Sequence, residues 1–210
     1  MVASMDPLAE QTITMTPSRP STVRAIFRSL LLAVAFFHSG LHASDLSDLL
    51  KSDAYVLLVR HAYAPGVGDP PGYSLEQCET QRVLNDEGRR QSERMGLWLR
   101  RQGVERAAVY SSVWCRCQET ARRLQLGPVT IEPALASFFD QPQQAAAQTA
   151  RLQAFVAQML RTKKDQALIL VTHHVNIRDY LGPDVGSGDM VLARVDAKGK
   201  VLGYKVYPSP

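Results

Sequence analysis

The apolar positions of the chain follow two recurring patterns, one with the length of a strand and one with the period of a helix. Continuous apolar runs of strand length cover residues 54–59, 107–112 and 166–174, and a shorter one covers 129–135. Such runs are typical of buried parallel strands. Between them, apolar residues recur at helical spacing in three segments, 84–103, 117–127 and 140–164.

The alternation of these patterns predicts an α/β fold with three α/β/α layers and a mostly parallel central sheet. We expect a short helix or linker over residues 44–53 and a short helix over residues 175–182. The segment 190–207 predicts a hairpin with Lys198 and Gly199 at its turn. Residues 64–73 are rich in proline and glycine, which predicts an irregular loop.

The first 43 residues have the composition of a leader that directs export. The apolar run SLLLAVAFF follows three arginines, Arg19, Arg24 and Arg28. This run is shorter than the roughly 20 residues that cross a bilayer, and small residues follow it up to a predicted cleavage after Ala43. We therefore expect a leader over 1–43, a single domain over 44–210 and a periplasmic or secreted protein. An uncleaved leader that anchors the protein in a membrane is the alternative.

The net charge of the chain indicates which charge a substrate would carry. The formal net charge is +4 and the pI is near 9.1, which is compatible with an anionic substrate. The basic residues form no stripe interleaved with aromatic residues, so nucleic-acid binding is not expected.

The three cysteines are an odd number for a chain bound for an oxidising compartment. We predict one disulfide, from Cys78 to either Cys115 or Cys117, with one thiol left free. The sequence CRC has no second pair of ligands at a useful spacing, so a zinc site is not expected.

Polar residues that can bind and transfer a phosphoryl group stand at the ends of three predicted strands. Arg60 and His61 follow the first strand, Arg116 follows the second, and His173 ends the run 166–174. The carboxyl ends of parallel strands meet at one edge of a sheet, so these side chains are expected to converge. Arginine binds phosphate oxygens through its planar fork, and a neutral imidazole can attack phosphorus.

The same residues carry a resemblance to a known family. The segments VRHA, SSVWCRCQETA and VTHHVNI resemble the signature segments of the histidine phosphatase superfamily, also called phosphoglycerate-mutase-like, in order and spacing. The resemblance implies that His61 is the phosphorylated nucleophile, that Arg60 and Arg116 bind the phosphoryl oxygens, and that His173 completes the pocket. It also implies a phosphatase that uses no metal and no cofactor.

Two positions depart from the family pattern. Ala62 replaces the usual glycine after the first histidine, and His174 stands where the family usually has glycine, so no role is assigned to it. Asn176 is interpreted either as a hydrogen-bonding residue of the pocket or as a cap of the short helix.

The proton donor of the leaving group is not identified by the resemblance. Many family members have a glutamate where this chain has Ser137, so Asp140 and Glu132 are taken as candidate donors. The loop carboxylates Asp69 and Glu76 are further candidates, although such residues are more often solvated. Compact members that act on protein phosphohistidine also lack this acid, but their chemistry is cytoplasmic. The substrate is therefore left open as a small molecule or a phosphorylated protein.

The sequence is also compatible, to different degrees, with three functions other than a histidine-based phosphatase. An exported domain that binds phosphorylated ligands with little or no turnover is the main alternative, and the missing acid supports it. Cys117 and Arg123 have the spacing of a cysteine-dependent phosphatase, but the intervening QETAR predicts a helix rather than a phosphate-binding loop. A mutase would have to retain its product, and no segment indicates that.

Overall fold

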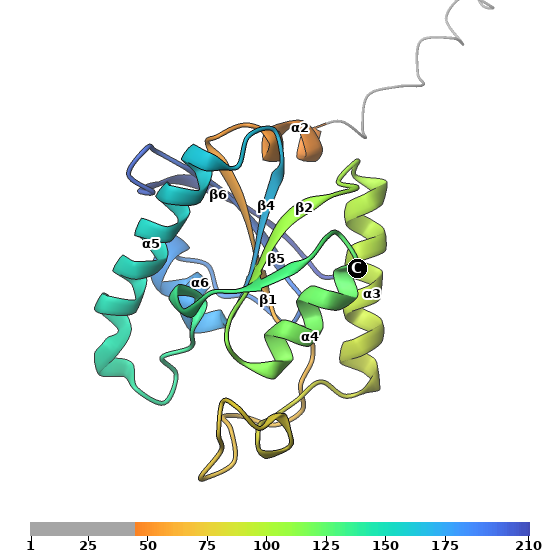
Figure 1. The fold of residues 1–210 in the computed structure, drawn as a ribbon, viewed down its shortest axis with the longest axis vertical. Coiled ribbons are helices and arrows are strands. Elements are labelled where there is room, and N and C mark those ends of the chain that lie inside the picture. Colours follow the sequence, from red (N-terminus) through yellow and green to blue (C-terminus); the bar gives the residue numbers. More distant parts are fainter. Residues whose placement is uncertain (1–44) are drawn as a thin grey trace, which may run out of the picture. The chain divides into compact units, whose positions relative to one another are not determined.

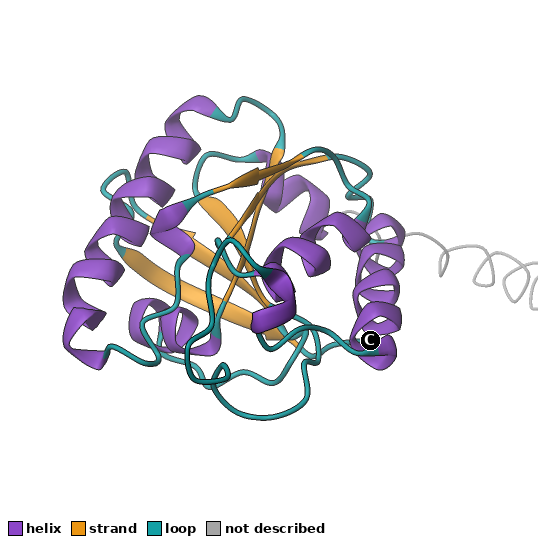
Figure 2. Ribbon diagram, turned by 60° about the horizontal axis from the view of Figure 1, so that its bottom comes forward, coloured by secondary structure: helices purple, strands orange, loops and turns teal. Residues whose placement is uncertain are grey.

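The computed structural model describes residues 45–210, and their fold is a six-stranded mixed sheet with helices on both faces (Figures 1 and 2). The strands have the order β3-β2-β4-β1-β5-β6. Their bounds are β1 Tyr55–Arg60, β2 Ala107–Ser111, β3 Val129–Ile131, β4 Ala167–Thr172, β5 Met190–Val195 and β6 Val201–Tyr207. The first four are mutually parallel, and β5 and β6 extend the sheet as an antiparallel edge. The predicted α/β/α fold class is confirmed.

Alternate residues of the central strands face opposite layers of helices. The helices are α2 Asp45–Lys51, α3 Asp86–Arg101, α4 Cys115–Leu124, α5 Ala145–Thr162 and α6 His174–Leu181. Leu57 and Val59 pack with α2, α3 and α4, whereas Val56 and Leu58 pack with α5 and α6 on the other face. Figure 1 shows α3 and α4 on one side of the sheet and α5 and α6 on the other. Each of these four strand residues is fully buried, so the sheet core excludes charged side chains.

The boundaries of α3 show how local chemistry positions an element. Its N-cap Asn85 accepts a hydrogen bond from the Gly88 N–H. Its last turn carries two arginines, whose positive charges are stabilising at the negative end of the helix dipole. The chain leaves this helix through Gly103, which has a positive φ of 81°. The predicted helix over 84–103 is therefore confirmed to within two residues at either end.

Three predicted boundaries were wrong. The strand predicted over 129–135 ends at Ile131, because Pro133 starts a 3-10 turn, η3 Pro133–Leu135. The helix predicted to begin at Cys117 begins at Cys115. The helix predicted from residue 140 begins at Ala145, after a second turn, η4 Pro142–Gln144. The first and third differences each add a short 3-10 turn before α5.

The hairpin of β5 and β6 is confirmed. Gly199 lies in its turn with a φ of 73°, and a Cβ atom there would come within 2.4 Å of the Gln153 carbonyl oxygen in α5. Glycine is therefore required both by the turn and by the close approach of the helix.

The predicted leader over 1–43 lies outside the described residues and stays a prediction. Within residues 45–210, no helix combines the length and the apolar character that a membrane span requires.

Candidate active site

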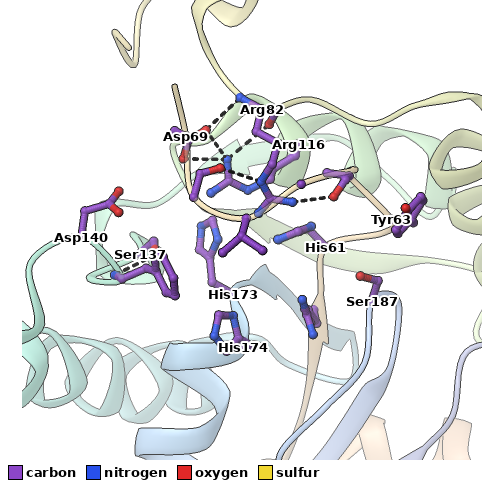
Figure 3. Close-up of a pocket in the computed structure, with 16 residues that line it drawn as sticks. His61, Tyr63, Asp69, Arg82, Arg116, Ser137, Asp140, His173, His174 and Ser187 are labelled. Carbon is purple, nitrogen blue, oxygen red and sulfur yellow. Dashed lines mark hydrogen bonds and ion pairs between the residues drawn. The ribbon is translucent and has the colours of Figure 1, made fainter. Parts of the chain in front are cut away.

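The carboxyl ends of β1, β4 and β2 bring the predicted site residues together. Arg60 pairs with Thr172 in the parallel register, and the His61 N–H donates to the Thr172 carbonyl at 3.0 Å. His173 is the N-cap of α6, and Arg116 lies in the first turn of α4. These side chains line a cavity of about 350 Å³, called here the strand-end cavity (Figure 3).

His61 is held as a neutral imidazole with a defined tautomer. Its ring is buried, and Nδ1 lies 2.8 Å from the Ala62 carbonyl oxygen. A carbonyl oxygen only accepts, so Nδ1 carries the proton and Nε2 keeps its lone pair. Burial holds the pKa of His61 well below its ordinary range, and the charge of Arg116 lowers it further. The geometry therefore presents a nucleophilic nitrogen.

His173 packs against His61 and is also kept neutral. The two ring centroids are 5.4 Å apart in an edge-to-face arrangement, and Figure 3 shows both rings at the same cavity. The Nε2 atom of His173 is hydrogen-bonded to the Ser112 hydroxyl at 2.9 Å. Burial, followed by the charge of Arg116, holds the pKa of His173 well below its usual value.

Three arginines line the cavity, and each anchors part of its guanidinium to the protein. Arg60 Nη1 donates to the Val185 carbonyl at 2.6 Å. Arg82 donates from Nε to the Gly68 carbonyl at 2.8 Å and from Nη1 to the Ala64 carbonyl at 2.6 Å.

The same arginines keep donors for a ligand. Among residues 45–210, no hydrogen bond forms to Nη2 of Arg60, Arg82 or Arg116. The buried Nε atoms of Arg60 and Arg116 also lack a partner in this part of the chain. Fixed guanidiniums with uncommitted donors suit a phosphoryl group.

Asp69 fixes the orientation of Arg116. Its Oδ1 accepts from Arg116 Nη1 at 2.8 Å and from the Arg82 backbone N–H at 2.9 Å. Its Oδ2 accepts from the Trp114 indole at 3.1 Å. The Asp69 and Arg116 side chains are only 2% and 4% exposed. Asp69 was considered as a proton donor, but both of its oxygens already accept hydrogen bonds, so its place is that of a positioning residue.

The two favoured acid candidates are separated by the fold. Glu132 does not line the strand-end cavity, because its carboxylate accepts from the Ala134 N–H at 2.8 Å and caps η3. The structure places this candidate away from the strand-end cavity, and the early end of β3 is the physical reason. Asp140 does line the cavity together with Ser137, and Tyr73 donates to Asp140 Oδ2 at 3.5 Å. Glu76 is exposed and accepts from Ser74, outside the cavity.

The structure also decides between the cysteine pairings. Cys78 and Cys115 form the disulfide, and Cys117 is a buried free thiol. Burial raises the pKa of Cys117 to about 12, and the residues between it and Arg123 are helical. A thiolate nucleophile with a phosphate-binding loop is therefore absent here, as the sequence predicted.

The sequence did not predict Arg82, which lines the cavity, and the role of Asn176 was misread, since it does not line the cavity. Arg82 carried no motif of its own, and only the loop that folds back over the strand ends brings it to His61. Asn176 is not a helix cap, because its Nδ2 donates to the Ala136 carbonyl at 2.9 Å and ties α6 to the segment that precedes Ser137.

The mixed sheet flanked by helices, with two histidines and three arginines lining a cavity at its strand ends, has the phosphoglycerate-mutase-like α/β fold. Comparison with known families confirms the predicted resemblance. The sequence model of the histidine phosphatase superfamily (branch 1) matches residues 56–139. No curated protein is significantly similar to the chain.

Solved structures share the fold at low sequence identity. The protein histidine phosphatase SixA complexed with tungstate is 20% identical, with a TM-score of 0.53, over 74% of this chain and 97% of that one. A mycobacterial glucosyl-3-phosphoglycerate phosphatase is 16% identical, with a TM-score of 0.54, over 74% and 98%. A phosphoserine phosphatase from Entamoeba histolytica is 10% identical, with a TM-score of 0.52, over 72% and 96%.

Within residues 45–210, no group of three or more histidine, cysteine, aspartate or glutamate side chains has the arrangement of a metal site.

Proposed function

We propose that this chain is a phosphatase that forms a covalent phosphohistidine on Nε2 of His61. The hydrogen bond from His61 Nδ1 to the Ala62 carbonyl carries the proposal, because it leaves the Nε2 lone pair free in a cavity lined by arginines. The match to the histidine phosphatase superfamily supports phosphatase activity.

The reaction has two displacement steps. In the first, Nε2 attacks phosphorus, an N–P bond forms, and the bond from phosphorus to the leaving group breaks. The leaving oxygen takes a proton from Asp140, the one candidate carboxyl group whose cavity position is compatible with that role. In the second, water attacks phosphorus, the N–P bond breaks, and inorganic phosphate leaves with His61 restored. Asp140 takes back the proton of that water.

The charge of the phosphoryl group is balanced by side chains of this chain. The Nη2 atoms of Arg60, Arg82 and Arg116 bind the equatorial oxygens, and His173 donates a further hydrogen bond as charge moves. Three guanidiniums supply the positive charge that a metal ion supplies in other phosphoryl-transfer enzymes, so we propose a reaction that needs neither metal nor cofactor.

The substrate is a phosphorylated small molecule or a phosphorylated protein. The similar structures include, by name, a protein histidine phosphatase and phosphatases of small phosphorylated molecules, so the fold is compatible with both.

We also propose that the protein is exported. The disulfide between Cys78 and Cys115 supports export, since such bonds persist in oxidising compartments. The leader-like composition of residues 1–43 gives the same prediction. Mass spectrometry of the protein recovered from the periplasm or medium would locate the cleavage, which is expected after Ala43.

The central test is chemical trapping of the intermediate. The protein is incubated with radiolabelled acetyl phosphate, quenched in alkali and digested, and an acid-labile phosphate is expected on His61. The His61→Ala variant should lose the label and the release of phosphate. His174→Ala is the matched control, because His174 lines the same cavity but packs against Phe139. Binding of phosphate without label or turnover would instead support a domain that only binds phosphorylated ligands.

A further inference from the structure

A second hollow lies beside the strand-end cavity and has no part in the steps above. This hollow, called here the side groove, has a volume of about 370 Å³, within the range of ligand pockets. Its lining includes Tyr73, Leu75, Trp114, Gln141, Gln144 and Arg151. Ser137 and Asp140 line both hollows, so the two adjoin at these residues. In Figure 3, Ser137 and Asp140 lie on the opposite side of the cavity from Tyr63 and Ser187.

The position of Asp140 fixes how a substrate would lie. When the phosphoryl group sits beside His61, the oxygen that joins it to the rest of the substrate points to an exit of the cavity. A proton donor must lie within hydrogen-bond reach of that oxygen. Asp140 is at the junction with the side groove, so the body of the substrate lies in the side groove.

The chemistry of the side groove favours a body that is apolar on its faces and polar at its edges. The ring of Tyr73 is half-buried in this lining, and the ring of Trp114, 6.4 Å away and tilted by 42°, is only 6% exposed, so Tyr73 supplies most of the aromatic surface. The amides of Gln141 and Gln144 are exposed in the same lining, where Gln144 donates to Gln141, and they keep further donors and acceptors for a ligand. Aromatic surface that packs on C–H groups, with amides for hydroxyl groups, suits a sugar ring.

The side groove has one cationic residue in its lining. Arg151 is exposed there, and it forms no ion pair with any residue in the range 45–210. Its one hydrogen bond in this range, to Gln148 Oε1 at 3.4 Å, is long. An anionic substituent on the sugar would therefore meet an uncompensated guanidinium.

The disulfide holds the aromatic wall in place. Trp114 directly precedes Cys115, and Tyr73 lies in the loop that Cys78 ends, so the bond ties the two segments that carry these rings. The side groove is thus built by covalent and packed structure rather than by loose surface side chains.

We propose that the side groove binds the sugar of a phosphorylated carbohydrate, and that a second acidic group on that sugar pairs with Arg151. This assignment rests on the proposed phosphatase function and specifies its substrate class. It selects a phosphate ester of an alcohol over a protein phosphohistidine, because the ester oxygen is the leaving group that needs the proton of Asp140.

Steady-state kinetics with a panel of substrates tests the assignment. The panel is p-nitrophenyl phosphate, glucose 6-phosphate, 6-phosphogluconate and a phosphohistidine-bearing carrier protein. The variants are Tyr73→Ala, Gln144→Ala and Arg151→Met, with Arg161→Met as the matched control on the same helix. Tyr73→Phe keeps the ring but removes the hydroxyl that donates to Asp140.

We expect kcat/KM for the two sugar phosphates to exceed that for the carrier protein. Tyr73→Ala should lower kcat/KM for both sugars by about tenfold, the effect of losing one aromatic contact. Arg151→Met should lower it for 6-phosphogluconate by a similar factor and leave glucose 6-phosphate within about twofold. Turnover of every substrate should stay unchanged in the control Arg161→Met. Gln144→Ala and Arg151→Met should lower turnover of p-nitrophenyl phosphate, which has neither sugar hydroxyls nor a second acid, less than turnover of the sugar phosphates.

Two results would overturn the assignment. One is a kcat/KM that is highest for the carrier protein and falls in Tyr73→Ala, Gln144→Ala and Arg151→Met. That result would show that the side groove is a protein-docking surface. The other is equal loss of all substrates, p-nitrophenyl phosphate included, in Gln144→Ala and Arg151→Met. Failure of the phosphatase proposal itself looks different, since it would leave no substrate hydrolysed and no label on His61.

Discussion

Loss of the Cys78–Cys115 disulfide is expected to destabilise the domain mainly through its unfolded state. The bond closes a loop with a sequence separation of 37 residues. Loop-closure entropy for about 38 residues gives a stabilisation of about 4 kcal/mol at 25 °C. The folded loop keeps other anchors, including the Arg82 side chain and the bond from the Cys115 N–H to Gln81 Oε1 at 3.0 Å. The reduced protein should therefore fold, but with lower stability.

The measurement is equilibrium unfolding in urea with and without reductant. Reduction should lower the free energy of unfolding by about 4 kcal/mol, or lower the melting temperature by about 8–16 °C for a domain of this size. The double variant Cys78→Ser, Cys115→Ala is the matched control. It should have the stability of the reduced protein, and reductant should not change it, because the one remaining thiol, Cys117, is buried.

A loss below about 1 kcal/mol would refute this reasoning. That result would mean that contacts of the loop already restrict the unfolded chain, so that closure entropy is not the main source of stability.

Two further predictions concern the charges of the site. Asp69→Asn removes one partner of a buried ion pair and should lower the free energy of unfolding by about 3 kcal/mol. Inorganic phosphate should then stabilise the variant more than the parent, because it pairs with Arg116, and equal stabilisation in thermal melts would contradict this. Second, the pKa values of His61 and His173 are depressed in the folded state, so the unfolded chain takes up protons first as pH falls below about 6.5. Stability should therefore decrease from pH 7 to pH 5, by at most about 2.7 kcal/mol per pH unit, and a flat or rising urea midpoint would contradict the buried neutral state.

The residues that the sequence placed at strand ends are the ones that the fold brings together. Arg60, His61 and His173 directly follow buried apolar runs, and parallel pairing leaves such residues at one edge of the sheet. Their convergence needed only the period of the strands and the alternation with helices. Arg116 was predictable for the same reason, because it opens the helix that follows β2.

The rest of the cavity depends on contacts across long stretches of chain. Asp69 belongs to the proline- and glycine-rich loop and Arg82 to the irregular segment that follows it. Both reach the cavity only because this part of the chain is held by hydrogen bonds and by the disulfide. From the sequence, Asp140 and Glu132 were also equally good candidates for the proton donor, because both lie close to Ser137 along the chain. The turn at Pro133 directs Glu132 to its own backbone, while Asp140 stays at the cavity.

The sequence by itself thus determined the fold class and the strand-end positions of Arg60, His61, Arg116 and His173, because both follow from periodicities that each segment carries locally. The tertiary structure alone decided the cysteine pairing, the tautomer of His61 and the side groove next to Asp140. These features are set by which backbone atom or distant side chain lies within a few ångströms, and that proximity is created only when the loops close over the edge of the sheet.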